Sequence, residues 1–371
     1  MNVIHKSDND TGCLNRDLGI FSLVAYGLNY MIPLAPAIVF GFIMKESGGT
    51  VALPYLIALL GMFFTALCYC FFIKRSPYAG SVFSYTKYAF KSKFIASITG
   101  WNIALDYVMV PAVTAESSAH YVHKLIPFLS INIISILFIL LCGSLSLFSI
   151  KSIGRSGIIF LIISEAVLII CLFSWGYSVH NGAGTGSILS TKPFEFSGTK
   201  ALLSSASIAI LSFLGFDAIS TLAEEARNPK SDIPRAILIC ITIGAVTMFL
   251  TGYLGMSVIP DWKELAANKD FLSSTMFYVN NISGGHILNQ FFITFFVISM
   301  AVFGVVAITG SSRLLYGISK NGIIPKKLSL ISQSTHIPIL SILLVVFLQI
   351  VTAMIIPIDM LAELMSVYGV G

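Results

Sequence analysis

The stretch Ser212-Phe213-Leu214-Gly215-Phe216-Asp217-Ala218-Ile219-Ser220-Thr221 lies within an apolar run at residues 200–224 and interrupts it with a glycine and a carboxylate. An aspartate at the centre of a membrane-spanning helix costs about 2.5–3.5 kcal/mol on insertion scales, so such a residue usually has a function. Gly215 allows the backbone to leave the helix and frees N–H and C=O groups, which only a cavity, a ligand or neighbouring helices can satisfy. The stretch therefore predicts half of a substrate site at mid-membrane.

The composition of the whole chain is that of a polytopic, all-α membrane protein. Of its 371 residues 56% are hydrophobic and 11% are charged, whereas an average soluble domain is about 25% charged. Nine apolar runs approach the length of a membrane span, at about 18–43, 52–73, 94–122, 131–150, 156–179, 200–224, 235–259, 288–312 and 337–357. A tenth run begins near residue 360 and is cut off at Gly371, so we expect a truncated form or a fragment that ends within helix 10.

The Lys and Arg residues alternate between the two sides of the predicted spans. The N-terminal segment 1–17 and every second loop after it hold 16 of these residues, and the remaining loops hold 6. Because cytoplasmic loops carry the excess of Lys and Arg, the sequence predicts a multi-pass protein of the cytoplasmic (inner) membrane with a cytoplasmic segment 1–17. The longest stretch between spans, about 260–287, is predicted to be an outward loop with at most a short helix.

A second interrupted helix lies at residues 18–43. It carries Tyr26-Gly27-Leu28-Asn29-Tyr30, followed by Pro33 and Pro36, and this pattern predicts unwinding at Tyr26–Tyr30. Two interrupted helices five spans apart indicate an inverted-repeat transporter, with repeats at about 18–180 and 200–371, the second incomplete at its C-terminus. The unwound backbone of the first helix would face an anionic group such as a carboxylate; a kinked span without a ligand is the alternative.

Three intramembrane carboxylates are candidates for proton coupling. Asp217 either binds a substrate ammonium, carries a coupling proton or caps the broken helix. Glu116, close to Thr114 in the third span, faces a cavity or makes an interhelical hydrogen bond. Glu165 is central in the fifth span, and no basic residue in the adjacent helices is an obvious partner for it. We expect H+ to be the coupling ion, with Na+ as the less favoured alternative. Asp106, near the cytoplasmic end of the third span, fits a structural role as well as a functional one.

No pattern of enzymes or metal proteins is found in the sequence. It contains no G-x-S-x-G, no H-E-x-x-H and no phosphate loop, and its six cysteines show no ligand spacing. His120 and His123 are better explained as interfacial anchors than as metal ligands. We therefore expect no catalytic residue, metal or cofactor, and a lipid bilayer rather than a nucleic acid around the chain. The oligomeric state is left open.

The stretch Thr221–Ile237, which reads TLAEEARNPKSDIPRAI, resembles the signature of the amino acid–polyamine–organocation (APC) family, G-F-D/E followed by E-E-x-x-N-P-x-x-x-I-P-x-A-I. Further stretches that resemble this family are Pro77–Tyr85, Gly100-Trp101 with Leu105–Tyr107, and Ser312–Tyr316 with Asn321–Pro325. The resemblance covers residues 18–371 and is greatest to the bacterial putrescine-importer branch.

The resemblance implies a LeuT-type fold of five-plus-five inverted repeats with broken helices 1 and 6. It also implies import driven by an ion gradient, commonly of protons, or exchange. The family's binding positions fall in this chain on Tyr26, Gly27, Leu28, Asn29, Tyr30, Phe213, Gly215, Phe216 and Asp217. Tyr107 matches a cavity-facing tyrosine of the importer branch, and Thr114 on the same helix completes the predicted set.

One departure from the importer branch bears on the substrate. That branch has an acidic residue just after the helix-one proline, where this chain has Pro36-Ala37-Ile38-Val39. Glu116 stands where the branch is apolar and would partly replace the lost acid. A neutral or cationic amino acid therefore fits the sequence as well as putrescine does. Besides a proton-coupled importer, the sequence allows an exchanger or a non-transporting truncated paralogue or sensor; a membrane-embedded enzyme is a distant third.

Overall fold

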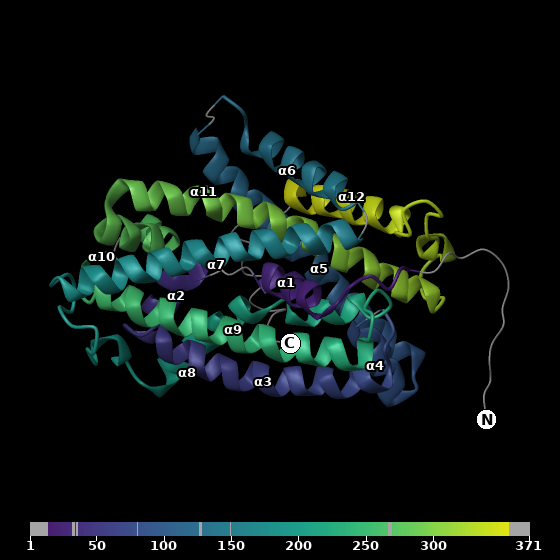
Figure 1. Cartoon of the computed structure of the whole chain (residues 1–371), viewed down its shortest axis with the longest axis horizontal. Coiled ribbons are helices and arrows are strands. Elements are labelled where there is room, and N and C mark those ends of the chain that lie inside the picture. The colour runs from purple at the N-terminus through teal and green to yellow at the C-terminus, as the bar shows by residue number, and fades with distance from the viewer. Residues whose placement is uncertain are drawn as a thin grey trace.

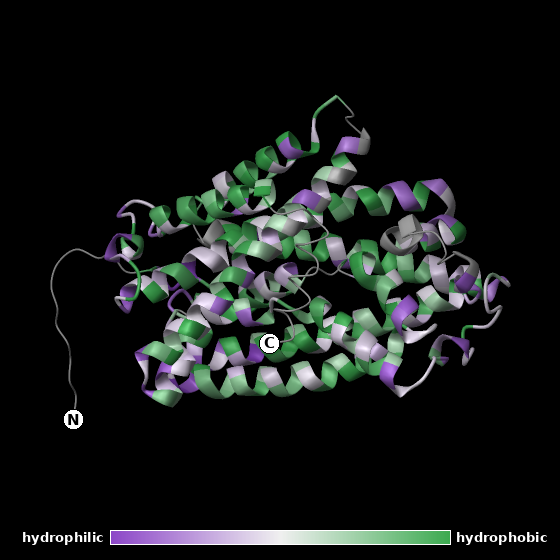
Figure 2. Cartoon of the chain, turned by 180° about the vertical axis from the view of Figure 1, so that it is seen from behind, coloured by the Kyte–Doolittle hydropathy of each residue, from purple (hydrophilic) through white to green (hydrophobic). Residues whose placement is uncertain are grey.

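The computed structural model describes residues 14–31, 34, 36–79, 81–125, 128–148, 150–265 and 269–355. Within these residues the chain forms helices and connecting loops, and the only strand-like pairing is an isolated parallel bridge between Leu18 and Ala226. The long helices lie side by side along the longest axis of the molecule (Figure 1). Polar residues gather at the two ends of this bundle, and apolar residues cover its flanks (Figure 2).

Each of the nine predicted runs coincides with helical structure. The elements are α1 (Ile20–Met31) with α2 (Pro36–Ser47), α3 (Ala52–Arg75), α5 (Lys93–Leu125), α6 (Ile131–Leu145), α7 (Ile150–His180), α8 (Thr199–Ile210) with η2 (Leu211–Phe213) and η3 (Phe216–Leu222), α9 (Pro229–Val258), α11 (Lys269–Lys320) and α12 (Ile339–Ile355). By length and composition, five described helical segments can each cross a membrane, or six if the bent pair α1–α2 is one span. The predicted truncation within helix 10 lies outside the described residues.

The first broken helix is interrupted later than predicted. Residues Tyr26–Tyr30 belong to the last turns of α1, which continues to Met31, and α2 is bent by 51° relative to α1. The prediction of unwinding at Tyr26–Tyr30 is therefore wrong. Gly27 serves close packing instead, because a Cβ there would lie 2.8 Å from Ile219 Cγ1 and 2.9 Å from Cys240 Sγ. Pro36 begins α2, at the helix position where the missing N–H of a proline is harmless.

The second broken helix is interrupted at the predicted glycine. The α-helix α8 gives way to η2, Leu214 is extended, and Gly215 has φ +114° and ψ −17° before η3 begins. This backbone conformation strongly favours glycine, since a Cβ is strained at positive φ. A Cβ at Gly215 would also overlap the ring of Tyr30. The two interrupted helices therefore touch each other at their breaks.

The predicted outward loop at 260–287 is wrong for most of its length. It contains α10 (Trp262–Leu265) and the first part of α11, which starts at Lys269 and kinks at Gly285. Met276 and Phe277 are buried, and Trp175 of α7 donates a hydrogen bond of 2.9 Å to Asn280. The buried residues of this helix pack against protein, and its polar residues keep it out of a search for membrane-length apolar runs.

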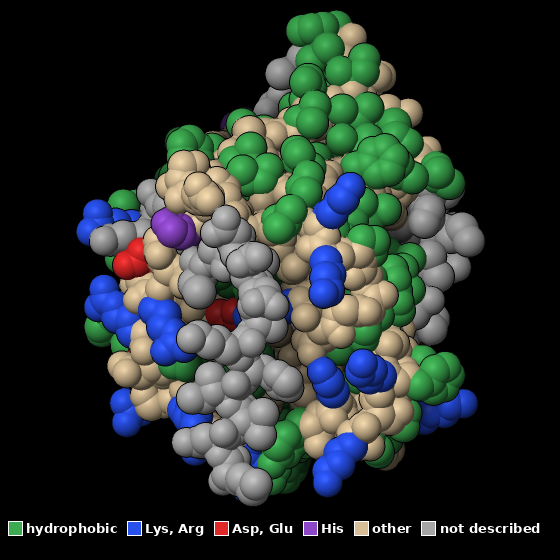
Figure 3. Space-filling view, turned by 90° about the vertical axis from the view of Figure 1, so that its right-hand side faces the viewer, with side chains coloured by type: hydrophobic (Ala, Val, Ile, Leu, Met, Phe, Trp, Pro, Cys, Tyr) green, Lys and Arg blue, Asp and Glu red, His purple; other side chains and the backbone are tan. Residues whose placement is uncertain are grey.

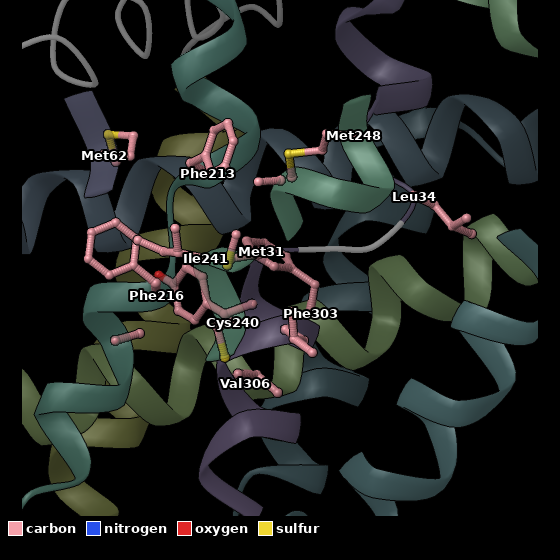
Figure 4. Close-up of a cluster of buried hydrophobic side chains, with 14 of the residues drawn as sticks. Met31, Leu34, Met62, Phe213, Phe216, Cys240, Ile241, Met248, Phe303 and Val306 are labelled. Atoms are coloured by element: carbon pink, nitrogen blue, oxygen red, sulfur yellow. The ribbon is translucent and has the colours of Figure 1, made fainter. Parts of the chain in front are cut away.

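Three further short elements lie outside the spans. They are α4 (Ser81–Phe90) between α3 and α5, η1 (Lys192–Phe194) before α8, and η4 (Lys326–Ser329) before α12. The main hydrophobic core surrounds the two breaks, and Figure 4 shows that Met31 and Leu34 of the first broken helix share it with Phe213 and Phe216 of the second. The core therefore holds the interrupted backbone in place from all sides, as an interruption at membrane depth requires.

Candidate substrate-binding site

The centre of the candidate site is a hydrogen bond between Tyr107 of α5 and Asp217 at the start of η3. Tyr107 Oη donates to Asp217 Oδ2 over 2.6 Å, a short distance typical of a bond to a charged acceptor. The Tyr107 side chain is buried, and Asp217 is only partly buried. The interrupted helix therefore presents a fixed, partly accessible carboxylate.

Tyr30 brings the first broken helix to the same place. Its ring centroid lies 5.7 Å from that of Tyr107 and 5.2 Å from that of Phe303. The hydroxyl group of Tyr30 is buried and has no hydrogen-bond partner among the described residues. A buried hydroxyl without a partner costs about 1–3 kcal/mol, so this group points to a polar ligand or a water molecule. Tyr30, Tyr107 and Asp217 thus converge on one position between the breaks.

The remaining predicted residues of α1 contact other parts of the protein. Tyr26 Oη donates to the carbonyl oxygen of Val306 over 2.9 Å. Asn29 Nδ2 donates to the carbonyl oxygens of Ala25 over 2.7 Å and of Gly157 over 2.8 Å. Gly27 and Leu28 are buried. These side chains fasten α1 to α11 and α7, and their assignment to the substrate stays a prediction.

Aromatic side chains form one wall beside Asp217. Phe213 and Phe216, both predicted, are buried, and the Phe216 ring packs edge-on against Tyr69 of α3 at 5.7 Å. Tyr69 in turn packs against Tyr85 of α4 at 5.6 Å. Tyr69 and Tyr85 were not among the predicted site residues. The signal available in the sequence is a tyrosine in the apolar run of α3, one of two there, and it becomes informative only once α3 is placed beside η3.

The other predicted polar residues of α5 and α7 lie apart from this centre. Thr114 Oγ1 donates to the carbonyl oxygen of Pro111 on its own helix over 2.9 Å. Glu116, nine residues beyond Tyr107, lies about 13.5 Å further along α5 at 1.5 Å per residue. Glu165 is partly buried on α7, next to Ser164, whose hydroxyl contacts that of Ser299 at 2.9 Å. The roles of Thr114, Glu116 and Glu165 stay predictions.

The electrostatics of the centre favour a cation. Among the described residues there are two salt bridges, Arg313–Glu225 and Lys320–Glu224, and neither includes Asp106 or Asp217. The described residues also contain no group of three or more His, Cys, Asp or Glu side chains that could hold a metal ion. The site has the negative charge and the hydrogen-bonding hydroxyls that an ammonium group requires.

Comparisons with known proteins agree with this geometry. A family model described as amino acid permease matches residues 18–371. The low-affinity putrescine importer PlaP of Escherichia coli (strain K12) is 28% identical over 316 residues, which are 84% of this chain and 69% of the importer. The branched-chain amino acid permease BcaP of Bacillus subtilis (strain 168) is 23% identical over 378 residues, which are 95% of this chain and 78% of that permease.

A solved structure with the same arrangement of helices is that of a Na+-coupled sialic acid symporter in a substrate-bound, outward-open state. It superposes with a TM-score of 0.65 at 11% sequence identity and covers 95% of this chain and 77% of the symporter chain. Such low identity shows the fold alone. The fold is of the LeuT type, as the sequence resemblance implied, and the prediction of an all-α membrane protein with two broken helices is confirmed.

Proposed function

Because the chain belongs to the amino acid permease family and is not an enzyme, we propose that it is a secondary transporter that imports an amino acid or a polyamine across the cytoplasmic membrane by alternating access. The observation that supports this proposal best is the Tyr107–Asp217 hydrogen bond at the meeting point of two helix breaks. Transporters of this type place their substrate and coupling-ion sites at such breaks near the bilayer midplane, and a carboxylate there would attract a cationic substrate group.

The proposed substrate group is a primary ammonium. Asp217 would accept two of its hydrogen bonds, and the free Tyr30 hydroxyl would accept another. Rings of Tyr107 and Phe303 flank this position and suit both the cation and an aliphatic chain attached to it. Putrescine and branched-chain amino acids, named for the two relatives, share this ammonium group.

The proposed energy source is a proton gradient, with the segment 1–17 and the Lys- and Arg-rich loops facing the cytoplasm. Asp217 is the first candidate for the coupling proton, because it also faces the substrate, and Glu116 and Glu165 are further candidates. A proton on Asp217 would neutralise the group that holds the ammonium, so protonation and amine binding would exclude each other there. Such competition is the simplest way for one carboxylate to couple two fluxes.

Uptake by purified protein in proteoliposomes tests this proposal. Labelled putrescine, lysine and leucine are offered with an inward proton gradient, with a Na+ gradient, and with neither. Accumulation that collapses with a protonophore supports a proton-coupled importer. Uptake that requires vesicles preloaded with unlabelled substrate supports the exchanger instead. Binding without any flux would contradict transport and favour the sensor.

A further inference from the structure

One end of the bundle displays many Lys and Arg side chains, and we call it the basic end (Figure 3). The loop after α3, the helix α4, the segment after η3 and the last turns of α11 meet there. In the proposed orientation this end faces the cytoplasm, where a substrate leaves the protein. Two consecutive glutamates of the segment after η3, Glu224 and Glu225, each bind a cation of α11 at this end.

The two ion pairs differ in their access to solvent. Glu225 and Arg313 are both fully buried and joined at 3.1 Å, so their pairing is part of the packed structure. Glu224 accepts a hydrogen bond of 2.9 Å from Lys320, whose side chain is 52% exposed. Glu224 itself is 16% exposed, so the pair is half-exposed, and pairs at the protein surface contribute only about 0–1 kcal/mol. The Lys320 ammonium can therefore reach water when it leaves Glu224, and the carboxylate keeps its hydrogen bonds from Tyr316 and Ala79.

The surroundings of Glu224 repeat those of Asp217. Tyr316 Oη donates to Glu224 Oε2 over 3.3 Å, as Tyr107 Oη donates to Asp217 Oδ2. The backbone N–H of Ala79 donates to the other oxygen of Glu224 over 3.3 Å. The Lys320 ammonium also lies 5.4 Å from the centroid of the Tyr316 ring, within the range of a cation–π contact. Glu224 is thus a carboxylate, oriented by a tyrosine, that already holds a primary ammonium.

A cavity of about 500 Å³ opens beside this ammonium. Its walls come from the loop after α3, α4, the segment after η3 and the end of α11, and they include Tyr78, Ser84, Lys87, Tyr88, Glu224 and Lys320. The exposed rings of Tyr78 and Tyr88 provide apolar walls. Lys87, which also lines the cavity, donates a hydrogen bond to Asn321. The cavity therefore has room for a small ligand next to the position of the Lys320 ammonium.

Aromatic side chains extend from the neighbourhood of Asp217 to α4, the helix that lines the cavity. Asp217 and Glu224 are seven residues apart, or about 14 Å at the 2.0 Å rise of a 3₁₀ helix. Phe216 contacts Tyr69, and Tyr69 contacts Tyr85 of α4. The neighbouring α4 residues Ser84, Lys87 and Tyr88 line the cavity. These ring contacts connect the surroundings of Asp217 with the helix that lines the cavity.

We propose that Glu224, Tyr316 and the adjoining cavity form a second binding position for a primary amine, from which the substrate displaces the Lys320 ammonium as it leaves toward the basic end. The proposal rests on the proposed function for the identity of the amine, and it is separable from that function by experiment. A diamine would use Glu224 alone, whereas an α-amino acid would also place its carboxylate on Lys87.

Binding of labelled putrescine and of labelled leucine to the purified full-length chain, measured by equilibrium dialysis, tests the second position. Asp217→Asn removes the charge of the central carboxylate. Lys320→Met removes the ammonium that binds Glu224 and keeps a side chain of similar length. In the double variant D217N/K320M we expect one equivalent of amine to bind, with a Kd at least tenfold lower than in D217N alone. Adding Glu224→Gln should abolish this equivalent, and D217N/K320R, which keeps the cation, should bind as weakly as D217N.

The matched control is Lys326→Met, which removes an exposed lysine of η4 that does not line the cavity. D217N/K326M should bind no more amine than D217N does. Lys87→Met in D217N/K320M distinguishes an amino acid from a diamine as the ligand. It should weaken the binding of leucine at least tenfold and leave the binding of putrescine unchanged. Amine binding absent from folded D217N/K320M, or retained after Glu224→Gln, overturns the second position. If the wild type and D217N bound the amine equally well, the proposed central site would be overturned instead.

Discussion

Gly215 and Tyr30 lie so close together that a Cβ at position 215 would overlap the Tyr30 ring. This contact joins the two broken helices at their interruptions, and it places the partnerless Tyr30 hydroxyl near the Asp217 carboxylate two residues beyond Gly215. Because Gly215 also has a positive φ of +114°, both its missing side chain and its backbone conformation are needed there.

Gly215→Ala should therefore damage both stability and transport. A positive φ for a residue with a side chain costs about 1–3 kcal/mol, and the overlap with Tyr30 adds to this. We expect a lower midpoint of thermal unfolding and uptake reduced at least tenfold. Gly182→Ala isolates the backbone effect, because Gly182 has φ +96° with open space around its Cβ position. Equal behaviour of the two variants would contradict a role for the Tyr30 contact.

Tyr107→Phe should weaken substrate binding while leaving the fold intact. It removes a hydrogen bond to a charged group, which contributes about 1.5–3 kcal/mol, equivalent to a 10–150-fold change in affinity. Thermal-shift titration with the transported amine measures the effect, since binding stabilises the folded state. Tyr177→Phe is the control, because Tyr177 is largely exposed on α7. An unchanged titration for Tyr107→Phe would show that Asp217 does not need this tyrosine.

Asp217→Asn should abolish transport, or uncouple it from the proton gradient, with expression largely unchanged. The amide keeps the shape of the side chain but loses the charge that would hold an ammonium and the site that would carry a proton. Counterflow in proteoliposomes at several pH values separates the two losses, because exchange needs amine binding and no net proton movement. Normal uptake with its usual pH dependence would reduce Asp217 to a cap of η3.

The break at Gly215 could be predicted because a glycine and an acid within an apolar run are unusual in any membrane-spanning helix. This signal does not depend on which helices lie next to it. The packing of α1 could not, because Gly27 looks the same in the sequence whether it bends a helix or admits Ile219 and Cys240. The Lys320–Glu224 pair joins residues 96 positions apart, and no local pattern specifies such a partner. The family signature located η3 and the segment after it, but the side-chain contacts of both segments depend on the folded chain.

The first part of α11 shows the same limit for a whole element. Its residues 269–284 are too polar for a span, with Asn280 and Asn281 among them, and they were predicted to form a loop. Trp175 satisfies one oxygen of Asn280, and buried neighbours such as Met276 supply the apolar contacts. The helix is stable because of a surface that only the folded bundle provides.

Asn29 offers a test of whether a predicted substrate residue acts through packing instead. Its amide donates to two backbone carbonyls, of Ala25 and Gly157, and so fastens α1 to α7. Asn29→Asp replaces the donor by a carboxylate oxygen, which the two carbonyl oxygens repel. Asn29→Leu only removes the two hydrogen bonds. If the role is packing, both variants should unfold at lower temperature, Asn29→Asp more so, and the KM for the amine should stay within about twofold.

The buried pair Arg313–Glu225 should contribute far more to stability than its exposed neighbour Lys320–Glu224. Removing one partner of a buried pair leaves an uncompensated charge and typically costs about 3–5 kcal/mol, whereas an exposed pair contributes about 0–1 kcal/mol. We therefore expect Glu225→Gln to lower the unfolding midpoint strongly and Glu224→Gln to change it little. The double variant E225Q/R313M should recover part of the loss, because no buried charge is left unpaired. Equal destabilisation by the two single glutamate variants would show that burial does not separate the two pairs, and the easy release of Lys320 from Glu224 would lose its physical basis.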